Sequence, residues 1–302
     1  MKNFKKLKWA LVLSGGGAKG LAHIGVLKAL ADMGAPEPAL VVGTSMGAIV
    51  GGLYACGMTP DELVRFVLDE FNIADYLDGF AFKINGPAGK FFQIGQILGN
   101  FATKPGIDSG QGLLQLFERL SGNKTFEETR IPFRCNAVDI VTGKEVVFDS
   151  GSVAKAIRAS MSFPFFFEPL LDGNRCLVDG GLSDNMPVYI PRQEGIKRVL
   201  AVDVMAFQAM PFSAFRTGPQ LIYRFMEAAM YRMSRKSRIH ADFTLYASNK
   251  TSPFNFARKK SFIDLGKQAV KVSAGQIEAF FSRDILPWKR RGRGGIISDA
   301  EE

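Results

Sequence analysis

Two glycine-rich turns, each lying between an apolar strand and a helix, constrain this chain most. The first, LVLSGGGAKG, runs from Leu11 to Gly20, and the second, VVGTSMGAIV, runs from Val41 to Val50. Glycine permits sharp turns and close backbone approaches that other residues exclude. Two strands that turn directly into helices are typical of an α/β fold in which the turns line one edge of a sheet.

The second turn carries a serine at its centre. In a G-x-S-x-G sequence the serine lies on a tight strand-to-helix turn, and the flanking glycines leave room for that strained backbone. Here Gly43 and Gly47 flank Ser45, a short strand precedes them at Leu40–Val42, and a small-residue helix begins at Met46. The pattern predicts that Ser45 is a nucleophile and that the two glycines form its elbow.

The first turn contains three consecutive glycines, Gly15, Gly16 and Gly17. A run without side chains between a strand and a helix leaves backbone N–H groups free to face developing negative charge. We therefore predict that this run forms an oxyanion hole.

A nucleotide site is the competing interpretation of the first turn. Gly15, Gly17 and Gly20 have the spacing of a dinucleotide-binding turn, which requires an acidic residue at the end of the second strand. That strand ends in Val42 and Gly43 without an acid, so the interpretation loses support. A phosphate-binding loop of the G-x-x-x-x-G-K-[ST] kind also fails, because leucine follows the last glycine.

A serine nucleophile needs a base, and the chain has only two histidines. His240 would complete the Ser, Asp, His order of α/β-hydrolases, whereas His23 falls in the first turn of the helix after the glycine run. Asp179 ends a short apolar strand and precedes Gly180 and Gly181, a turn that presents it at a loop mouth. We favour Asp179 as the base and keep His240 as the alternative.

Four separate segments resemble the patatin-like phospholipases, also called patatin-like acyl hydrolases. They are SGGGAKG (14–20) followed by AHIGVL (22–27), GTSMG (43–47), AIRASMS (156–162), and DGG (179–181) followed by NMPV (185–188). The resemblance extends from about residue 11 to about residue 274. It implies a three-layer α/β/α fold and a lipid ester substrate. It also implies a Ser–Asp dyad without histidine, in which Ser45 attacks the acyl carbonyl and Asp179 is the base.

Two positions depart from that family pattern. Lys19 stands where many members carry arginine, and the segment SFPFFF (162–167) is bulkier after its proline than is usual. The second departure is expected to narrow or reshape the acyl pocket. The dyad itself is chemically reasonable, because an aspartate with a pKa near 4 is ionised at neutral pH and can accept a proton within hydrogen-bond reach.

Alternating strands and helices predict a mostly parallel sheet covered on both faces. The expected strands are 10–13, 40–42, 133–139, 145–148, 176–178, 198–203 and 243–247, with a hairpin turn at Thr142-Gly143. The expected helices are 20–33, 46–55, 60–68, 110–120, 152–160, 218–235 and 262–281.

We expect one acyl hydrolase domain over residues 8–282 and a disordered tail over 287–302, which is basic, then glycine-rich, then acidic. Residues 81–108 have little periodicity and are expected to form a loop or lid beside the site.

The net charge of +9 and the isoelectric point near 9.5 are compatible with nucleic acid or an anionic membrane surface. No nucleic-acid motif supports the first, so we predict no nucleic-acid partner. Residues 207–233 mix large apolar side chains with arginines. Such a helix can lie on a bilayer or pack on the domain's own core, and both alternatives stay open.

Two observations bear on the cellular compartment and on cofactors. The apolar stretch after the N-terminal lysines is only Trp9–Leu13, shorter than a signal peptide requires. The three cysteines have neither a disulfide framework nor metal-ligand spacing. We expect a cytoplasmic protein with peripheral membrane contact and no metal or organic cofactor. A catalytically idle lipid- or protein-binding member of the same fold is the alternative function.

Overall fold

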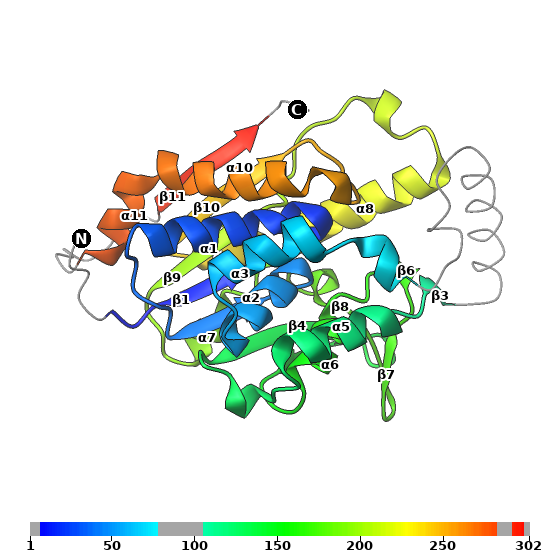
Figure 1. Ribbon diagram of the computed structural model, residues 1–302. Coiled ribbons are helices and arrows are strands. Elements are labelled where there is room, and N and C mark those ends of the chain that lie inside the picture. The colour runs from blue at the N-terminus through cyan, green and yellow to red at the C-terminus, as the bar shows by residue number, and fades with distance from the viewer. Residues whose placement is uncertain (1–6, 78–104, 283–291, 299–302) are drawn as a thin grey trace.

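The computed structural model describes residues 7–77, 105–282 and 292–298, whose strands build one large sheet and one small one (Figure 1). Along the large sheet the strands follow the order β11 (Gly292–Ser298), β10 (Phe243–Asn249), β9 (Val199–Asp203), β1 (Ala10–Leu13), β2 (Leu40–Gly43), β4 (Phe133–Asp139), β8 (Arg175–Asp179) and β7 (Leu170–Asp172). β5 (Lys144–Phe148) pairs with β4 beside this path, and β3 (Gly106–Asp108) pairs with β6 (Phe165–Phe167) in the small sheet.

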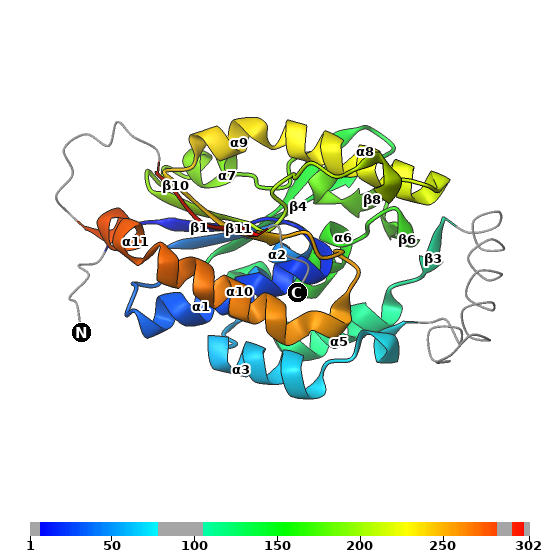
Figure 2. The same ribbon diagram turned by 90° about the horizontal axis from the view of Figure 1, so that it is seen from above.

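The six strands from β11 to β4 are parallel, whereas β5, β7 and β8 pair antiparallel to their neighbours. Helices cover both faces (Figure 2). This confirms the predicted mostly parallel sheet between helical layers. On one face lie α1 (Ala22–Asp32), α2 (Met46–Cys56), α3 (Pro60–Arg65), α5 (Gln111–Ser121), α6 (Val153–Ser160), α10 (Lys259–Val272) and α11 (Ala274–Phe281), and on the other α7 (Tyr189–Gln193), α8 (Gly218–Met233) and α9 (Arg235–His240).

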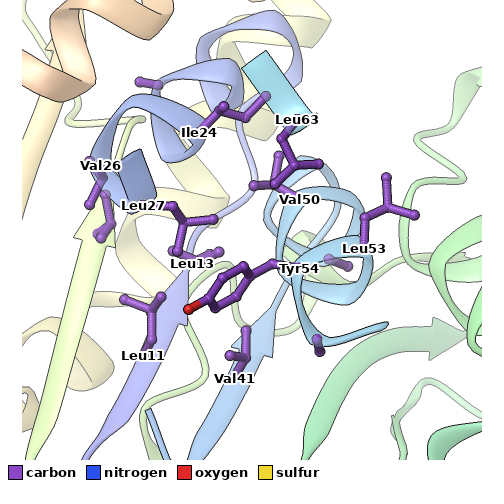
Figure 3. Close-up of a cluster of buried hydrophobic side chains, with 14 of the residues drawn as sticks. Leu11, Leu13, Ile24, Val26, Leu27, Val41, Val50, Leu53, Tyr54 and Leu63 are labelled. Atoms are coloured by element: carbon purple, nitrogen blue, oxygen red, sulfur yellow. The ribbon is translucent and has the colours of Figure 1, made fainter. Parts of the chain in front are cut away.

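The central strands are apolar throughout because both of their faces are covered. In β1, Leu11 and Leu13 join the core beneath α1 and α2, a cluster that Figure 3 shows with Val41 of β2. Ala10 and Val12 point the other way and join the core beneath α7. The alternation of side chains along each strand thus gives two cores, one on each side of the sheet.

The register at β4 brings two strand ends together. Cys135 pairs with Phe148 of β5 and with Gly43 of β2, and two residues later Ala137 pairs with β5 and with Asp179 of β8. A strand has only two edges, so β2 and β8 share the edge of β4 that β5 does not use. Since β8 runs opposite to β2, their carboxyl ends face each other along that edge.

Two of the predicted helices are interrupted at a serine. The predicted helix 262–281 is interrupted at Ser273, which separates α10 from α11, and the predicted helix 218–235 is interrupted at Ser234. Both serines are buried. The hairpin turn at Thr142-Gly143 does connect β4 to β5.

The C-terminal region differs from the expected disordered tail. Residues 292–298 form β11, which pairs with β10 over seven residues and extends the sheet beyond residue 282. Glycine has a low strand propensity, but at Gly295 a side chain would meet the Tyr246 carbonyl oxygen at 1.9 Å, so the close approach selects glycine. Most of the expected loop 81–108 lies outside the described residues, and its last three residues form β3.

Candidate active site

Ser45 lies on the turn between β2 and α2. Its backbone has φ 53° and ψ −121°, a positive-φ conformation that is costly for a residue with a side chain. Glycines surround it for steric reasons: a Cβ on Gly43 would meet the Gly47 carbonyl oxygen at 2.3 Å, and one on Gly47 would meet the Leu13 oxygen at 2.2 Å. The turn is therefore tight enough to raise Ser45 above the end of the sheet.

The backbone of Ser45 is held by a second serine. Its N–H donates to Ser160 Oγ over 2.9 Å, and Ser160 lies fully buried at the end of α6. Ser160 belongs to the segment 156–162 that the sequence analysis noted without assigning a role. The hydrogen bond gives that segment a structural task at the turn.

Asp179 ends β8 and is buried, with 1% of its surface exposed. Its Oδ1 accepts a hydrogen bond from the Gly181 N–H at 2.8 Å. The Ser45 hydroxyl lies close enough to lower the pKa of the carboxyl group, although no described donor reaches the buried Oδ2 with the geometry of a full hydrogen bond. The carboxylate therefore faces Ser45 with one oxygen still available to accept a proton.

Burial dominates the acidity of Asp179. Desolvation of the carboxylate raises its pKa from 3.8 to about 6, and the contacts with Ser45 and the Gly181 N–H offset part of that rise. At neutral pH the group is still ionised, yet it is a stronger base than an exposed aspartate.

The backbone on either side of Asp179 is fixed by two buried residues. The Asp179 N–H donates to the Ser162 carbonyl at 3.0 Å. After it, the turn at Gly180 packs on Asn136, whose carbonyl oxygen would lie 2.3 Å from a Cβ at that position. Asn136 also accepts from the Thr44 hydroxyl at 2.8 Å and donates to the Gly180 carbonyl at 3.3 Å. One side chain thus ties the residue before the serine to the residue after the aspartate.

The glycine run passes against the same turn. A Cβ on Gly15 would come within 3.0 Å of the Ser45 Cβ. The Gly15 N–H is already used, because it donates to Asn185 Oδ1 at 3.1 Å. The N–H groups of Gly16 and Gly17 donate to no other residue in the part of the chain that the structure describes. The predicted run therefore contains one anchored and two unused donors.

Asn185 holds the run in place with both ends of its amide. Besides accepting from the Gly15 N–H, it donates through Nδ2 to the Gly15 carbonyl at 3.3 Å, and its own N–H donates to the buried Ser234. Asn185 lies in the segment 185–188 that resembles the family, but the sequence pattern assigns it no role. The reason is that its partner lies 170 residues away in the chain.

Ser45 and Asp179 open into an apolar cavity of about 380 Å³. One wall is a stripe on α2, Met46, Ile49, Val50 and Leu53, whose spacing is that of one helix face. Further lining comes from α3, α5 and the π-helical turn at Phe66–Glu70, through Leu63, Phe66, Val67, Leu113, Leu116 and Phe117. The bulky segment predicted to reshape the pocket does reach it, through Phe163, Phe166 and Phe167.

Neither histidine lies in the cavity lining. His240 is exposed at the end of α9, just before β10 begins, whereas Ser45 follows the end of β2. β10 and β2 run in the same direction within the sheet. His240 precedes one strand and Ser45 follows the other, so the two residues lie at opposite ends of the strands. His23 is fully buried beneath the glycine run, and its Nε2 donates to the Ser14 carbonyl at 2.8 Å. Burial lowers the pKa of His23 to about 4, which keeps it neutral.

Lys19 is a buried anchor. Its Nζ donates to the Asn249 carbonyl at 2.8 Å, which ties the glycine run to the end of β10. Burial lowers its pKa. Among the residues described, no group of three His, Cys, Asp or Glu side chains is arranged to hold a metal ion.

Comparison with known proteins identifies the family of this chain. The sequence matches the family described as patatin-like phospholipase over residues 11–192. It is 34% identical over 194 residues to "Lysophospholipase NTE1" of Kluyveromyces lactis and 34% identical over 196 residues to the protein of the same name from Yarrowia lipolytica. Each alignment covers 64% of this chain and 12% of the relative, so the chain spans a small part of these proteins.

Among solved structures, the chain resembles VipD from Legionella pneumophila with a TM-score of 0.48 and 18% identity, over 88% of this chain and 67% of that one. The family match is the stronger finding, because it covers more than half of the 302 residues and includes both glycine turns, Ser45 and Asp179. By that match, this chain belongs to the patatin-like phospholipase family.

Proposed function

We propose that this protein is a serine acyl hydrolase that cleaves carboxylic ester bonds of lipids, with a phospholipid or lysophospholipid as substrate. The observation that carries the proposal is the pairing of Ser45 with a buried carboxylate, Asp179, at the head of an apolar cavity. An activated nucleophile, a base and a water-poor acyl site are the components that ester hydrolysis needs.

In the proposed reaction, Ser45 Oγ attacks the ester carbonyl carbon while the Asp179 carboxylate takes the hydroxyl proton. The tetrahedral intermediate collapses when Asp179 returns that proton to the leaving alcohol, which leaves an acyl group on Ser45. Asp179 then removes a proton from an attacking water molecule, and when the second tetrahedral intermediate collapses it returns that proton to Ser45 Oγ, which releases the fatty acid and restores both the serine hydroxyl and the carboxylate.

The developing oxyanion is assigned to the N–H groups of Gly16 and Gly17. These donors have no other partner among the described residues. Gly15 was part of the predicted oxyanion hole, but its N–H is engaged by Asn185, so we assign it to holding the loop against Ser45. Since Asp179 does the work of a His–Asp pair, the oxyanion donors supply much of the rate; losing one such donor typically costs about 10²- to 10³-fold.

The fatty acyl chain is assigned to the stripe on α2. From Met46 to Leu53 this helix face extends for roughly 10 Å at 1.5 Å per residue, and its lining is apolar. Burial of an acyl chain there contributes binding energy in proportion to the apolar area removed from water. The name of the two relatives, lysophospholipase, supports the lipid class.

We further propose that residues 8–282 together with β11 act as one hydrolase domain, in the cytoplasm and in peripheral contact with an anionic membrane. In the part of the chain that the structure describes, no helix is long and apolar enough to cross a bilayer.

Covalent labelling by a fluorophosphonate probe tests the proposal directly. Wild type is expected to take the label and hydrolyse acyl esters, whereas Ser45→Ala loses both, and Asp179→Asn loses turnover and most of the labelling rate. Absence of label in the wild type, under conditions in which a known serine hydrolase reacts, would instead support the catalytically idle binding protein.

A further inference from the structure

Helix α8 has one face on the cavity and a second, apolar face that is exposed. Tyr223, Glu227 and Met230 recur at the helix period and line the cavity. On the other side, Leu221, Ile222 and Phe225 are 57%, 49% and 72% exposed. At 100° per residue the two sets point in nearly opposite directions. A helix that only packs on the domain's own core has no need of the second set, which we name the outer face of α8.

The exposed apolar surface extends beyond the helix. In the segment before α8, Phe212 is 85% exposed. Beside the helix, the rings of Phe166 and Phe254 stack at 4.5 Å, line the cavity and are still partly exposed, and Tyr223 contacts Phe254 edge-on. The cavity thus reaches the surface next to α8. Large apolar side chains that cluster in this way mark an interaction site.

Charge distinguishes among the partners that such a surface could bind. Between residues 207 and 240 the exposed basic side chains are Arg216, Arg232, Arg235 and Lys236, and none forms an ion pair with a described residue. The single carboxylate in that stretch, Glu227, pairs with Arg224 at 2.6 Å. The surface is therefore apolar at its centre and positive at its border, which complements an anionic bilayer.

We propose that the outer face of α8, together with Phe212, is a docking surface for an anionic lipid bilayer. The apolar side chains enter the acyl region, and the four basic residues contact the lipid headgroups. In this orientation the mouth at Phe166 and Phe254 lies at the membrane, so a lipid reaches Ser45 without crossing water. This inference deepens the proposed function and rests on it for the identity of the transferred lipid, but the docking itself does not require catalysis.

Vesicle co-sedimentation in a Ser45→Ala background tests the docking without consuming the lipid. The probe is vesicles of equal parts phosphatidylcholine and phosphatidylglycerol, with pure phosphatidylcholine beside them. The test variants are Leu221→Ser and Phe225→Ser for the apolar centre, and Arg232→Gln with Arg235→Gln for the border. The matched controls are Val272→Ser, which is 57% exposed on α10, and Lys260→Gln, which is exposed on the same helix.

Each apolar substitution is expected to weaken partitioning into the mixed vesicles about tenfold. Each lost arginine is expected to weaken it about fivefold, only on the anionic vesicles and less at high salt. The two control variants are expected to partition as the parent does. In the Ser45 enzyme, the test variants retain turnover of a short-chain soluble ester but lose hydrolysis of vesicle lipid.

Equal partitioning of test and control variants would overturn the docking surface while leaving the hydrolase intact. Concentration-dependent dimerisation that Phe225→Ser abolishes, with no vesicle binding, would assign the surface to a second copy of the chain and also overturn the proposal. Vesicle binding by the Ser45→Ala protein together with an inactive wild type would keep the docking surface and reject the hydrolase.

Discussion

Ser45 follows the end of β2 and Asp179 forms the end of β8, and these two strands lie with their carboxyl ends facing each other along one edge of β4. Gly43 closes β2 opposite Cys135, and Asp179 closes β8 opposite Ala137. Two residues of an extended strand span roughly 7 Å, which is about the space that a serine side chain and a carboxylate need to meet. The strand register therefore sets the distance between the two residues, and the loops adjust only the orientation of their side chains.

The first prediction concerns pH. Because burial raises the pKa of Asp179 to about 6, the proposed base is ionised above that pH and protonated below it. We expect kcat/KM for a soluble ester to rise with pH through about 6 and to level off above 7, with roughly a tenth of the plateau value left at pH 5. A profile that rises near 4 instead would mean that Asp179 is solvated and does not have this role. His23 does not produce the expected rise, since its pKa lies near 4.

The second prediction links the same group to stability. Its folded pKa lies above its unfolded pKa, so the folded state binds the proton more tightly and loses stability as pH rises from about 4 to 6. Above pH 6 the ionised, buried carboxylate costs on the order of 2 to 3 kcal/mol. Asp179→Asn removes that cost while keeping an oxygen for the Gly181 N–H. We expect it to raise the Tm at pH 8 and to leave it nearly unchanged at pH 4, and equal Tm shifts at both pH values would refute the linkage.

The third prediction concerns Asn185. Asn185→Ala removes the two side-chain hydrogen bonds to Gly15 and keeps only the one that the Asn185 backbone carbonyl accepts at 3.3 Å, so the glycine run is held less firmly against Ser45. We expect kcat and the rate of fluorophosphonate labelling to fall roughly 10- to 100-fold with little change in KM. The midpoint of the pH profile is expected to stay near that of the wild type, because the carboxylate keeps its surroundings. A general loss of folding would instead lower the Tm and change KM as well.

The fourth prediction tests the acyl channel. Leu53→Phe adds bulk at the far end of the α2 stripe and is expected to reduce turnover of long-chain esters at least tenfold relative to short-chain esters. Leu27→Phe is the matched control, since Leu27 is buried in the same core cluster but does not line the cavity. Overpacking destabilises both variants by about 1 to 3 kcal/mol, and only Leu53→Phe should change the chain-length preference. If the two variants have the same chain-length preference, the assignment of the acyl chain to α2 is wrong.

The fifth prediction separates the dyad from a triad. His240 lies at the amino-terminal end of the parallel strands, whereas Ser45 lies at their carboxyl end, so His240→Ala is expected to retain nearly full esterase activity. The measurement is kcat/KM on the same soluble ester beside Asp179→Asn. An inactive His240→Ala enzyme with an unchanged Tm would replace the dyad by a Ser, Asp, His triad.

The sequence predicted the strand and the helix on either side of Ser45 closely, because that turn depends on neighbouring residues. The strand expected at 40–42 and the helix expected at 46–55 correspond to β2 and α2 within one residue at each end. Glycine positions decide such turns, because only glycine avoids the 2.2 and 2.3 Å contacts that a Cβ would make there. The sequence could not show β11, since its glycine-rich residues form a strand only where β10 offers an edge.

The sequence alone predicted the candidate residues: a serine on a glycine elbow, an acid at a strand end, and a run of three glycines. It did not determine that these groups meet, because a hydrogen-bond register between strands more than thirty residues apart leaves no local pattern. Only the tertiary structure decided the antiparallel course of β8, the engagement of Gly15 by Asn185 and the burial of Asp179. That burial sets the basicity of the carboxylate, since removing water from a charge is a property of everything packed around it.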